Sequence, residues 1–190
     1  MSETIRTFIA LELSPEIKSE LTNVQDLLKP SKADVKWTKP GSMHLTLKFL
    51  GNIAQEKAEE VKKSLESVSS RHKPFEVSLF EIGGFPRLES PRVIWVGIDK
   101  GCAQAEALAK DVEETLSGIG FEKEKRPFTA HLTLGRVRSP KGRNELVLKI
   151  KALDFKPSAS CTIDKIILFQ STLTPQGPIY TPLYQGRFQK

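Results

Sequence analysis

Alternating apolar and polar residues predict β-strands along much of the chain. In the two clearest segments, 44–50 and 131–137, leucines alternate with histidine and threonine. Because strand side chains point alternately to opposite faces, each segment has an apolar face and a His/Thr face. Further strands are predicted over 5–13, 34–38, 75–82, 93–98 and 162–172, with a turn and a last strand over 178–187; 145–153 fits either a strand or a short helix.

Three other segments, 15–28, 54–69 and 102–117, repeat apolar residues at the spacing of amphipathic helices. Ser14 and Pro15 suit the N-cap and first position of the first helix. The Gly/Pro-rich segment 83–91 and the basic segment 138–144 are predicted loops.

Strands and helices mix in two comparable halves, each with one His/Thr segment. We therefore expect an α+β fold and a single bilobed domain spanning 1–190, with two pseudo-symmetric antiparallel sheets, helices on their outer faces and a central cleft. The first and last strands are expected to share a lobe.

A nine-residue phrase occurs twice, and it surrounds both His/Thr segments. Each copy has a basic residue, a proline, three further residues and then His-Leu-Thr-Leu, beginning at Lys39 and at Arg126. The chain has only three histidines, and two of them, His44 and His131, stand in these phrases. Such a repeat is poorly explained by coincidence.

Each copy presents an imidazole and a hydroxyl on the same strand face, about 7 Å apart in backbone rise. These are His44 with Thr46, and His131 with Thr133. Imidazole titrates near neutral pH, and a hydroxyl donates hydrogen bonds to anionic oxygens. Two imidazoles on opposite sides of a cleft suit in-line displacement at phosphorus, one as base and the other as acid.

The charge of the chain favours a polyanionic partner. It has 29 Lys and Arg against 23 Asp and Glu, a net charge of +6. Basic residues concentrate next to the two phrases, at Lys29, Lys32, Lys36, Lys39, Lys123, Lys125, Arg126, Arg136, Arg138, Lys141 and Arg143. This placement adds weight to a polyanionic partner.

Several other classes lack support in the sequence. No apolar stretch is long enough to span a membrane, and the N-terminus lacks the layout of a signal peptide. Cys102 and Cys161 form no Cys-x-x-Cys motif, so we expect a cytoplasmic protein with free thiols. Neither a metal-ligand motif nor a Gly-rich phosphate loop is present, so no metal, no cofactor and no ATP dependence are expected.

The paired motifs make the sequence resemble the 2H phosphoesterase superfamily, which is defined by two His-x-Thr-x motifs. Within it, the chain is most similar to the RNA 2′,3′-cyclic phosphodiesterases, also called 2′-5′ RNA ligases. The resemblance covers nearly the whole chain. It rests on Arg6, Phe8, Ile9, Ala10, Trp37, 44–51 and 126–136.

This resemblance implies metal-independent hydrolysis of an RNA or nucleotide 2′,3′-cyclic phosphate to a terminal 2′-phosphate. By the family pattern, His44 protonates the leaving 3′ oxygen and His131 activates water, while Thr46 and Thr133 hold the non-bridging oxygens. An RNA 5′-hydroxyl replacing water would give 2′-5′ ligation without ATP.

Five further residues are candidates for substrate binding. Arg126 and Arg136 flank the second motif and could clamp a phosphate, while Phe8, Trp37 and Phe128 could stack on a base. His72, outside the motifs, is expected to be a surface residue.

Two alternatives remain open at the level of sequence. One is a 2H phosphoesterase for another ester, such as a 2′-5′ oligonucleotide or an ADP-ribose cyclic phosphate. The other is a non-catalytic RNA-binding module, although such a module has no need of two imidazoles. The expected oligomeric state is a monomer.

Overall fold

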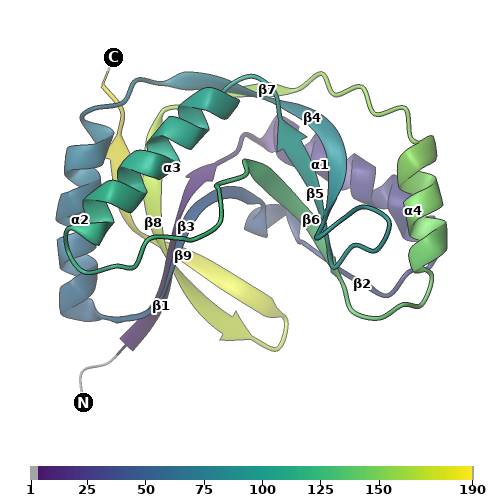
Figure 1. Cartoon of the computed structure of the whole chain (residues 1–190), viewed down its shortest axis with the longest axis horizontal. Helices are drawn as coiled ribbons and strands as arrows, with labels where there is room; N and C mark the ends of the chain where they lie inside the picture. The colour runs from purple at the N-terminus through teal and green to yellow at the C-terminus, as the bar shows by residue number, and fades with distance from the viewer. Residues whose placement is uncertain (1–3, 190) are drawn as a thin grey trace.

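Two antiparallel β-sheets lie next to each other in the computed structural model, which describes residues 4–189 (Figure 1). Within these residues, a four-stranded sheet has the order β3-β1-β8-β9, and a five-stranded sheet has the order β2-β6-β5-β4-β7. The strands are β1 Thr4–Glu12, β2 Val35–Trp37, β3 His44–Ala54, β4 Phe75–Phe85, β5 Val93–Ile98, β6 His131–Val137, β7 Ser160–Ile163, β8 Lys165–Thr174 and β9 Gly177–Arg187. The predicted α+β class and the shared sheet of the first and last strands are confirmed.

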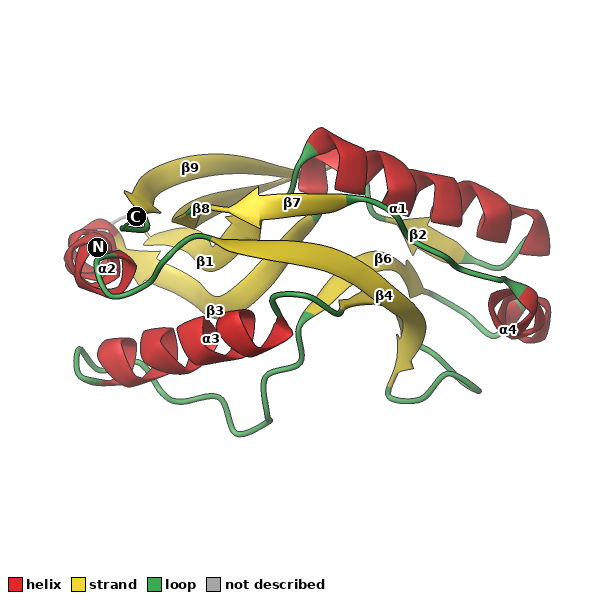
Figure 2. Cartoon of the chain, turned by 90° about the horizontal axis from the view of Figure 1, so that it is seen from above, coloured by secondary structure: helices red, strands yellow, loops and turns green. Residues whose placement is uncertain are grey.

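Helices cover the outer side of each sheet (Figure 2). They are α1 Pro15–Leu28, α2 Gln55–Ser69, α3 Cys102–Ser117 and α4 Arg143–Ala152. The helix after β1, α1, packs on the five-stranded sheet with α4, whereas the helix after β5, α3, packs on the four-stranded sheet with α2. Each sheet is thus covered by one helix from the first half of the chain and one from the second. Within residues 4–189, no helix is both long and apolar enough to cross a bilayer.

Local signals explain where the first helix begins. Ser14 is the N-cap of α1, and its hydroxyl oxygen accepts a hydrogen bond from the Ile17 N–H at 3.4 Å, with Pro15 at the first helical position. The apolar face of α2, made by Ala58, Val61, Leu65 and Val68, is buried as the periodicity predicts.

The two motif strands are placed by their leucines. Leu45 and Leu47 of β3, and Leu132 and Leu134 of β6, are buried in the core. The alternation of the strand turns the His/Thr faces away from that core. Because β3 and β6 contact each other where the lobes meet, both His/Thr faces open into the space between the lobes.

Long-range pairing explains three predictions of element boundaries that were wrong. The motif strand predicted over 44–50 continues to Ala54, because Gly51, at φ +74°, lets it stay paired with β1 beyond a bulge. Residues 83–85, predicted as loop, extend β4 by pairing with β5.

The predicted strand 162–172 is two strands that separate at Asp164, of which β7 pairs with β4 and β8 pairs with β1. The ambiguous segment 145–153 is helical, and its helix begins at Arg143, inside the predicted basic loop.

Candidate active site

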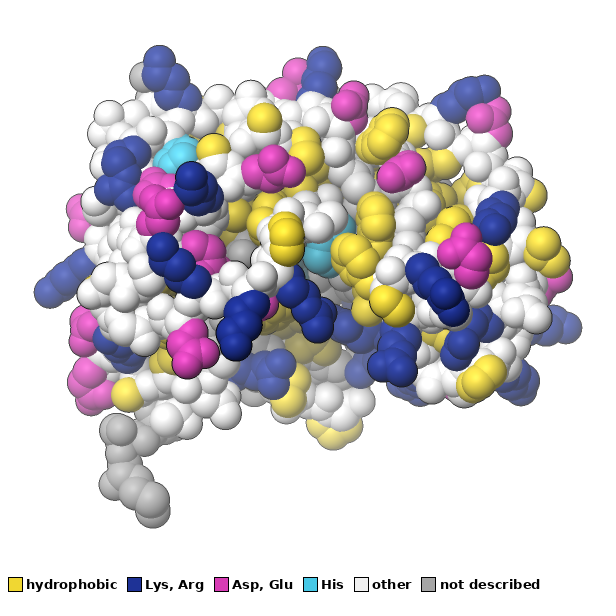
Figure 3. All heavy atoms as spheres, in the orientation of Figure 1, with side chains coloured by type: hydrophobic (Ala, Val, Ile, Leu, Met, Phe, Trp, Pro, Cys, Tyr) yellow, Lys and Arg dark blue, Asp and Glu magenta, His cyan; other side chains and the backbone are white. Residues whose placement is uncertain are grey.

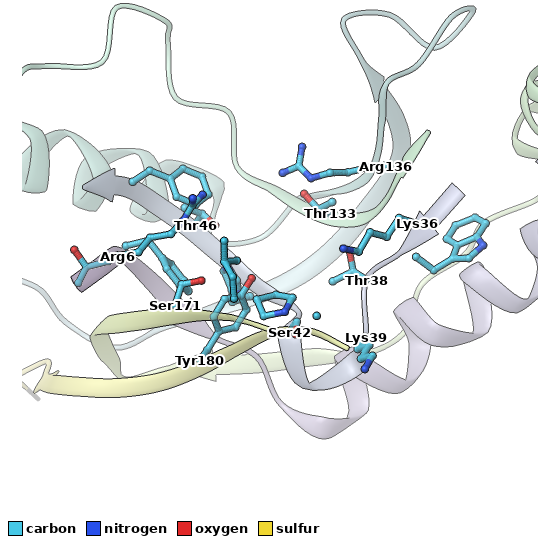
Figure 4. A pocket seen from close by; sticks show the side chains of 18 of the residues that line it. Arg6, Lys36, Thr38, Lys39, Ser42, Thr46, Thr133, Arg136, Ser171 and Tyr180 are labelled. Carbon is cyan, nitrogen blue, oxygen red and sulfur yellow. The ribbon is translucent and has the colours of Figure 1, made fainter. Parts of the chain in front are cut away.

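Both His/Thr pairs line one cavity of about 530 Å³ between the lobes. Thr46 projects into it from β3 and Thr133 from β6 (Figure 4). The lining comprises Arg6, Thr7, Phe8, Lys36, Trp37, Thr38, Lys39, Ser42, His44, Thr46, Phe49, Gly51, His131, Thr133, Arg136, Ser171, Leu173, Gln176, Gly177, Pro178 and Tyr180. Two imidazoles that are 87 residues apart in the sequence therefore face one solvent-filled space.

Aromatic rings fix the imidazole of His44. Phe8 stacks on it with ring centroids 4.7 Å apart, and Tyr180 meets it edge-on at 5.2 Å. Phe8 also stacks on Phe169 at 5.3 Å, and the centroid of Phe169 lies 6.4 Å from that of the imidazole. This aromatic cluster draws on all four strands of the four-stranded sheet and leaves the His44 ring little freedom to turn.

His131 is held by a hydrogen bond and by different rings. Its Nδ1 lies 2.7 Å from the carbonyl oxygen of Thr129, so Nδ1 carries the proton that is donated there. Nε2 of the neutral ring is therefore the nitrogen that can accept a proton. Phe85 and Trp95 contact the imidazole edge-on, at centroid distances of 5.0 and 6.3 Å.

Burial shifts both imidazoles toward the neutral form. It lowers the pKa of His44 from 6.5 to about 4; a hydrogen bond with the Ser42 backbone opposes this shift, and the charge of Lys18 adds to it. Burial also lowers the pKa of His131, against the hydrogen bond to Thr129 and with the charge of Arg136. Both rings are therefore neutral at pH 7 while the cavity is free of an anion.

The described lining of the cavity carries only positive formal charge. Arg6, Lys36, Lys39 and Arg136 line it, and no Asp or Glu among residues 4–189 does so. Register explains one pair, since Lys36 of β2 lies directly opposite Arg136 of β6. Lys39 is fixed by donating a hydrogen bond to the carbonyl of Gln176 at 2.8 Å. Such a cavity attracts anions.

Not every residue predicted to bind substrate lies in the cavity. Trp37 and Arg136 line it, but Arg126 and Phe128 do not, because β6 begins only at His131 and both belong to the preceding loop. Phe8 borders the cavity but is only 2% exposed, because His44, Phe169 and Tyr180 pack against its ring. Stacking of Phe8 on a base stays a prediction, and the small exposed area of the ring speaks against it.

Sequence reasoning missed several lining residues. Tyr180 and Leu173 come from the β8–β9 hairpin, far from either motif in the chain. Phe49, five residues after His44, lines the cavity with 65% of its surface exposed. Phe49 follows His44 by five residues in the sequence, just as Arg136 follows His131. Continuing the comparison of the two motifs past Leu47 and Leu134 would have shown Phe49 as a candidate lining residue.

Within the part of the chain that the structure describes, no group of three or more His, Cys, Asp or Glu residues could hold a metal ion. His72 lies outside the cavity, and its Nε2 is 2.9 Å from a carboxylate oxygen of Asp111.

Comparison with known proteins agrees with this geometry. A family model described as "LigT like Phosphoesterase" matches the chain twice, over residues 11–95 and 96–180, with one motif in each match. The RNA 2′,3′-cyclic phosphodiesterase of Methanothermobacter thermautotrophicus is 32% identical over 179 residues, covering 94% of this chain and 96% of its own. That of Aquifex aeolicus is 34% identical over 182 residues, covering 94% and 95%.

Solved structures show the same fold. The protein TT0787 of Thermus thermophilus superposes with a TM-score of 0.80 at 25% identity, covering 97% of this chain and 98% of that one. E. coli LigT complexed with 3′-AMP superposes with a TM-score of 0.79 at 25% identity, covering 99% and 100%.

Two lobes with a His-x-Thr strand from each facing one cavity define a 2H phosphoesterase, and the resemblance seen in the sequence is confirmed. The chain belongs to the LigT-like phosphoesterase family.

Proposed function

We propose that this protein hydrolyses the 2′,3′-cyclic phosphate at the end of an RNA or nucleotide to a terminal 2′-phosphate, without a metal ion. The observation that carries the proposal is the convergence of both His/Thr pairs on one cavity lined by cations and by no described carboxylate. The curated relatives bear the name of this activity, and E. coli LigT was crystallised with a nucleotide.

The proposed step is a displacement at phosphorus. His131 Nε2 takes a proton from water as the water oxygen bonds to phosphorus, and the bond from phosphorus to the 3′ oxygen breaks. His44 gives its proton to that oxygen, leaving a 3′-hydroxyl and a 2′-phosphate. Thr46 and Thr133 donate hydrogen bonds to the non-bridging oxygens, and Arg136 offsets their charge.

The acid role requires a protonated His44, although burial lowers the pKa of the free imidazole to about 4. The substrate resolves this conflict, because a cyclic phosphodiester brings a negative charge next to the half-enclosed imidazole. That charge raises the pKa of the neighbouring imidazole, so His44 gains its proton as substrate binds. The Nδ1 hydrogen bond of His131 fixes the tautomer that a base needs.

Two further features of substrate use follow from the same cavity. Phe49 is an exposed aromatic ring on its wall, and we propose it as the platform on which the terminal base stacks.

With the 5′-hydroxyl of a second RNA in place of water, the same displacement forms a 2′-5′ linkage. One chain supplies the whole described lining, so we propose that a monomer is active.

Incubation with a 2′,3′-cyclic nucleotide in EDTA, followed by phosphorus NMR, tests the proposal. We expect one product, the 2′-phosphate, at a rate that EDTA does not change. A 3′-phosphate product would mean that the 2′ oxygen leaves instead of the 3′ oxygen. Loss of turnover in EDTA, restored by added metal, would refute metal independence.

A further inference from the structure

Basic residues continue beyond the cavity along the open edge of the five-stranded sheet. We call Lys32, Arg138 and Lys141 the edge patch; all three are exposed. Their backbones are neighbours, because the Arg138 N–H donates to the Asp34 carbonyl at 2.8 Å and the Asp34 N–H donates to the Lys141 carbonyl at 3.2 Å. Gly142, next to Lys141, packs closely against the backbone of 32–33.

This patch is continuous with the cavity. Lys36 and Arg136, which lie opposite each other on β2 and β6, line the cavity, and Arg138 follows two residues beyond Arg136. Figure 3 shows Lys and Arg side chains gathered at the lower right of the molecule, where β2, the end of β6 and the start of α4 lie in Figure 1. Positive charge therefore leads from the cavity to the edge of the sheet.

The cations of the edge patch are not neutralised by protein groups. Within residues 4–189, none of the three forms an ion pair with a carboxylate, and Asp34, the acidic residue in this turn, has no such partner either. The basic segment before the second motif differs, because Glu122 and Glu124 alternate with Lys123 and Lys125 there. Of the two basic segments beside this motif, the later one therefore has the larger excess of positive charge.

We propose that the edge patch binds backbone phosphates of the RNA on the 5′ side of the cyclic phosphate, so that an oligonucleotide is preferred over a mononucleotide. This inference rests on the proposed function. An RNA with a cyclic phosphate at its 3′ end extends from the cavity only in the 5′ direction, so its remaining phosphates leave along one path. Unpaired lysine and arginine side chains along such a path bind phosphates without regard to sequence.

The test compares two substrates, 2′,3′-cyclic CMP and an oligouridylate of five nucleotides ending in a 2′,3′-cyclic phosphate. It uses the wild type, the variant R138A/K141A, and K123A/K125A as a control that removes the same charge from the segment before the motif. For R138A/K141A we expect the KM of the oligonucleotide to rise about fivefold to tenfold, with cyclic CMP kinetics unchanged. The slope of log KM against log salt should fall by about 1.4, since each lost contact to a single strand contributes about 0.7.

Equal oligonucleotide KM values for R138A/K141A and the wild type would overturn the inference. Equal increases in both double variants would also overturn it, because they would indicate a general effect of charge. If the wild type turns over neither substrate, the proposed function fails instead. Fluorescence anisotropy with the same labelled oligonucleotide then tests the patch, through a loss of binding confined to R138A/K141A.

Discussion

Lys48 of β3 and Glu113 of α3 form a mostly buried ion pair, with Nζ 2.8 and 2.7 Å from the two carboxylate oxygens. The same Nζ donates to the Glu122 carbonyl at 2.9 Å, and Glu113 accepts the Glu124 N–H at 3.2 Å. The strand of the first motif is thereby tied to the loop that leads into the second motif.

Replacing Lys48 by methionine should lower the free energy of unfolding by about 3 kcal/mol, because it leaves a largely buried carboxylate without its partner. Urea denaturation measures the change. Lys62→Met is the matched control, since Lys62 pairs with Glu59 on the surface, where an ion pair is worth less than about 1 kcal/mol. Equal losses of unfolding free energy in the two variants would show that the Lys48–Glu113 pair stabilises the fold no more than a surface ion pair does.

Alanine at either motif histidine should lower kcat on a 2′,3′-cyclic nucleotide by roughly 10²- to 10⁴-fold, the range for loss of a general acid or base. His72→Ala is the control, because His72 lies outside the cavity and bonds to Asp111. Circular dichroism of each variant separates loss of chemistry from loss of fold. Near-normal turnover in His44→Ala or His131→Ala would remove that residue from the mechanism.

The pH dependence of kcat should differ from that of kcat/KM. The kcat/KM profile reports groups of the free enzyme, where burial lowers the pKa of His44 to about 4. Since the acid must be protonated, kcat/KM should decline as pH rises through that region. The kcat profile reports the complex, in which the substrate anion raises the pKa of His44, so kcat should persist to higher pH. If kcat and kcat/KM declined over the same range of rising pH, protonation of His44 would not be coupled to substrate binding.

The parts of the fold that depend on local pattern could be predicted from the sequence. Period-two alternation located β6, and the Ser14-Pro15 signal located the start of α1. The choice of partner strand has no local signal. The segment 162–172 contains neither Gly nor Pro that would mark a break, yet the chain changes sheets at Asp164 because β7 and β8 pair with different strands.

The candidate site, like the fold, could be predicted only where the signal is local. The repeated phrase identified four residues that line one cavity, because each copy encodes its own strand face. The burial of Phe8 could not be read from the sequence, because Phe169, a ring that packs against it, is 161 residues away. Tyr180 reaches His44 only through the pairing of β8 with β9 and of β1 with β8.

Gly83→Ala should reduce both stability and kcat. A Cβ at this position would lie 2.1 Å from the Trp95 ring, which contacts His131. Moving that ring is expected to cost about 1–3 kcal/mol and to loosen the imidazole. Gly41→Ala is the control, because a Cβ there would meet nothing within 4 Å. Urea denaturation and steady-state kinetics check both effects; unchanged kcat alongside lost stability would show that Trp95 does not position His131.

Phe49→Ala should weaken substrate binding without unfolding the protein. The ring is 65% exposed, so its loss has little effect on the core, whereas a base stacked on it contributes about 1–3 kcal/mol. We expect KM for a cyclic nucleotide to rise about tenfold and Phe49→Trp to retain binding. Phe80→Ala is the matched control, since Phe80 is 55% exposed on β4, outside the cavity lining. Similar KM values for the two alanine variants would place the base elsewhere, and Trp37 would then be the lining aromatic to test.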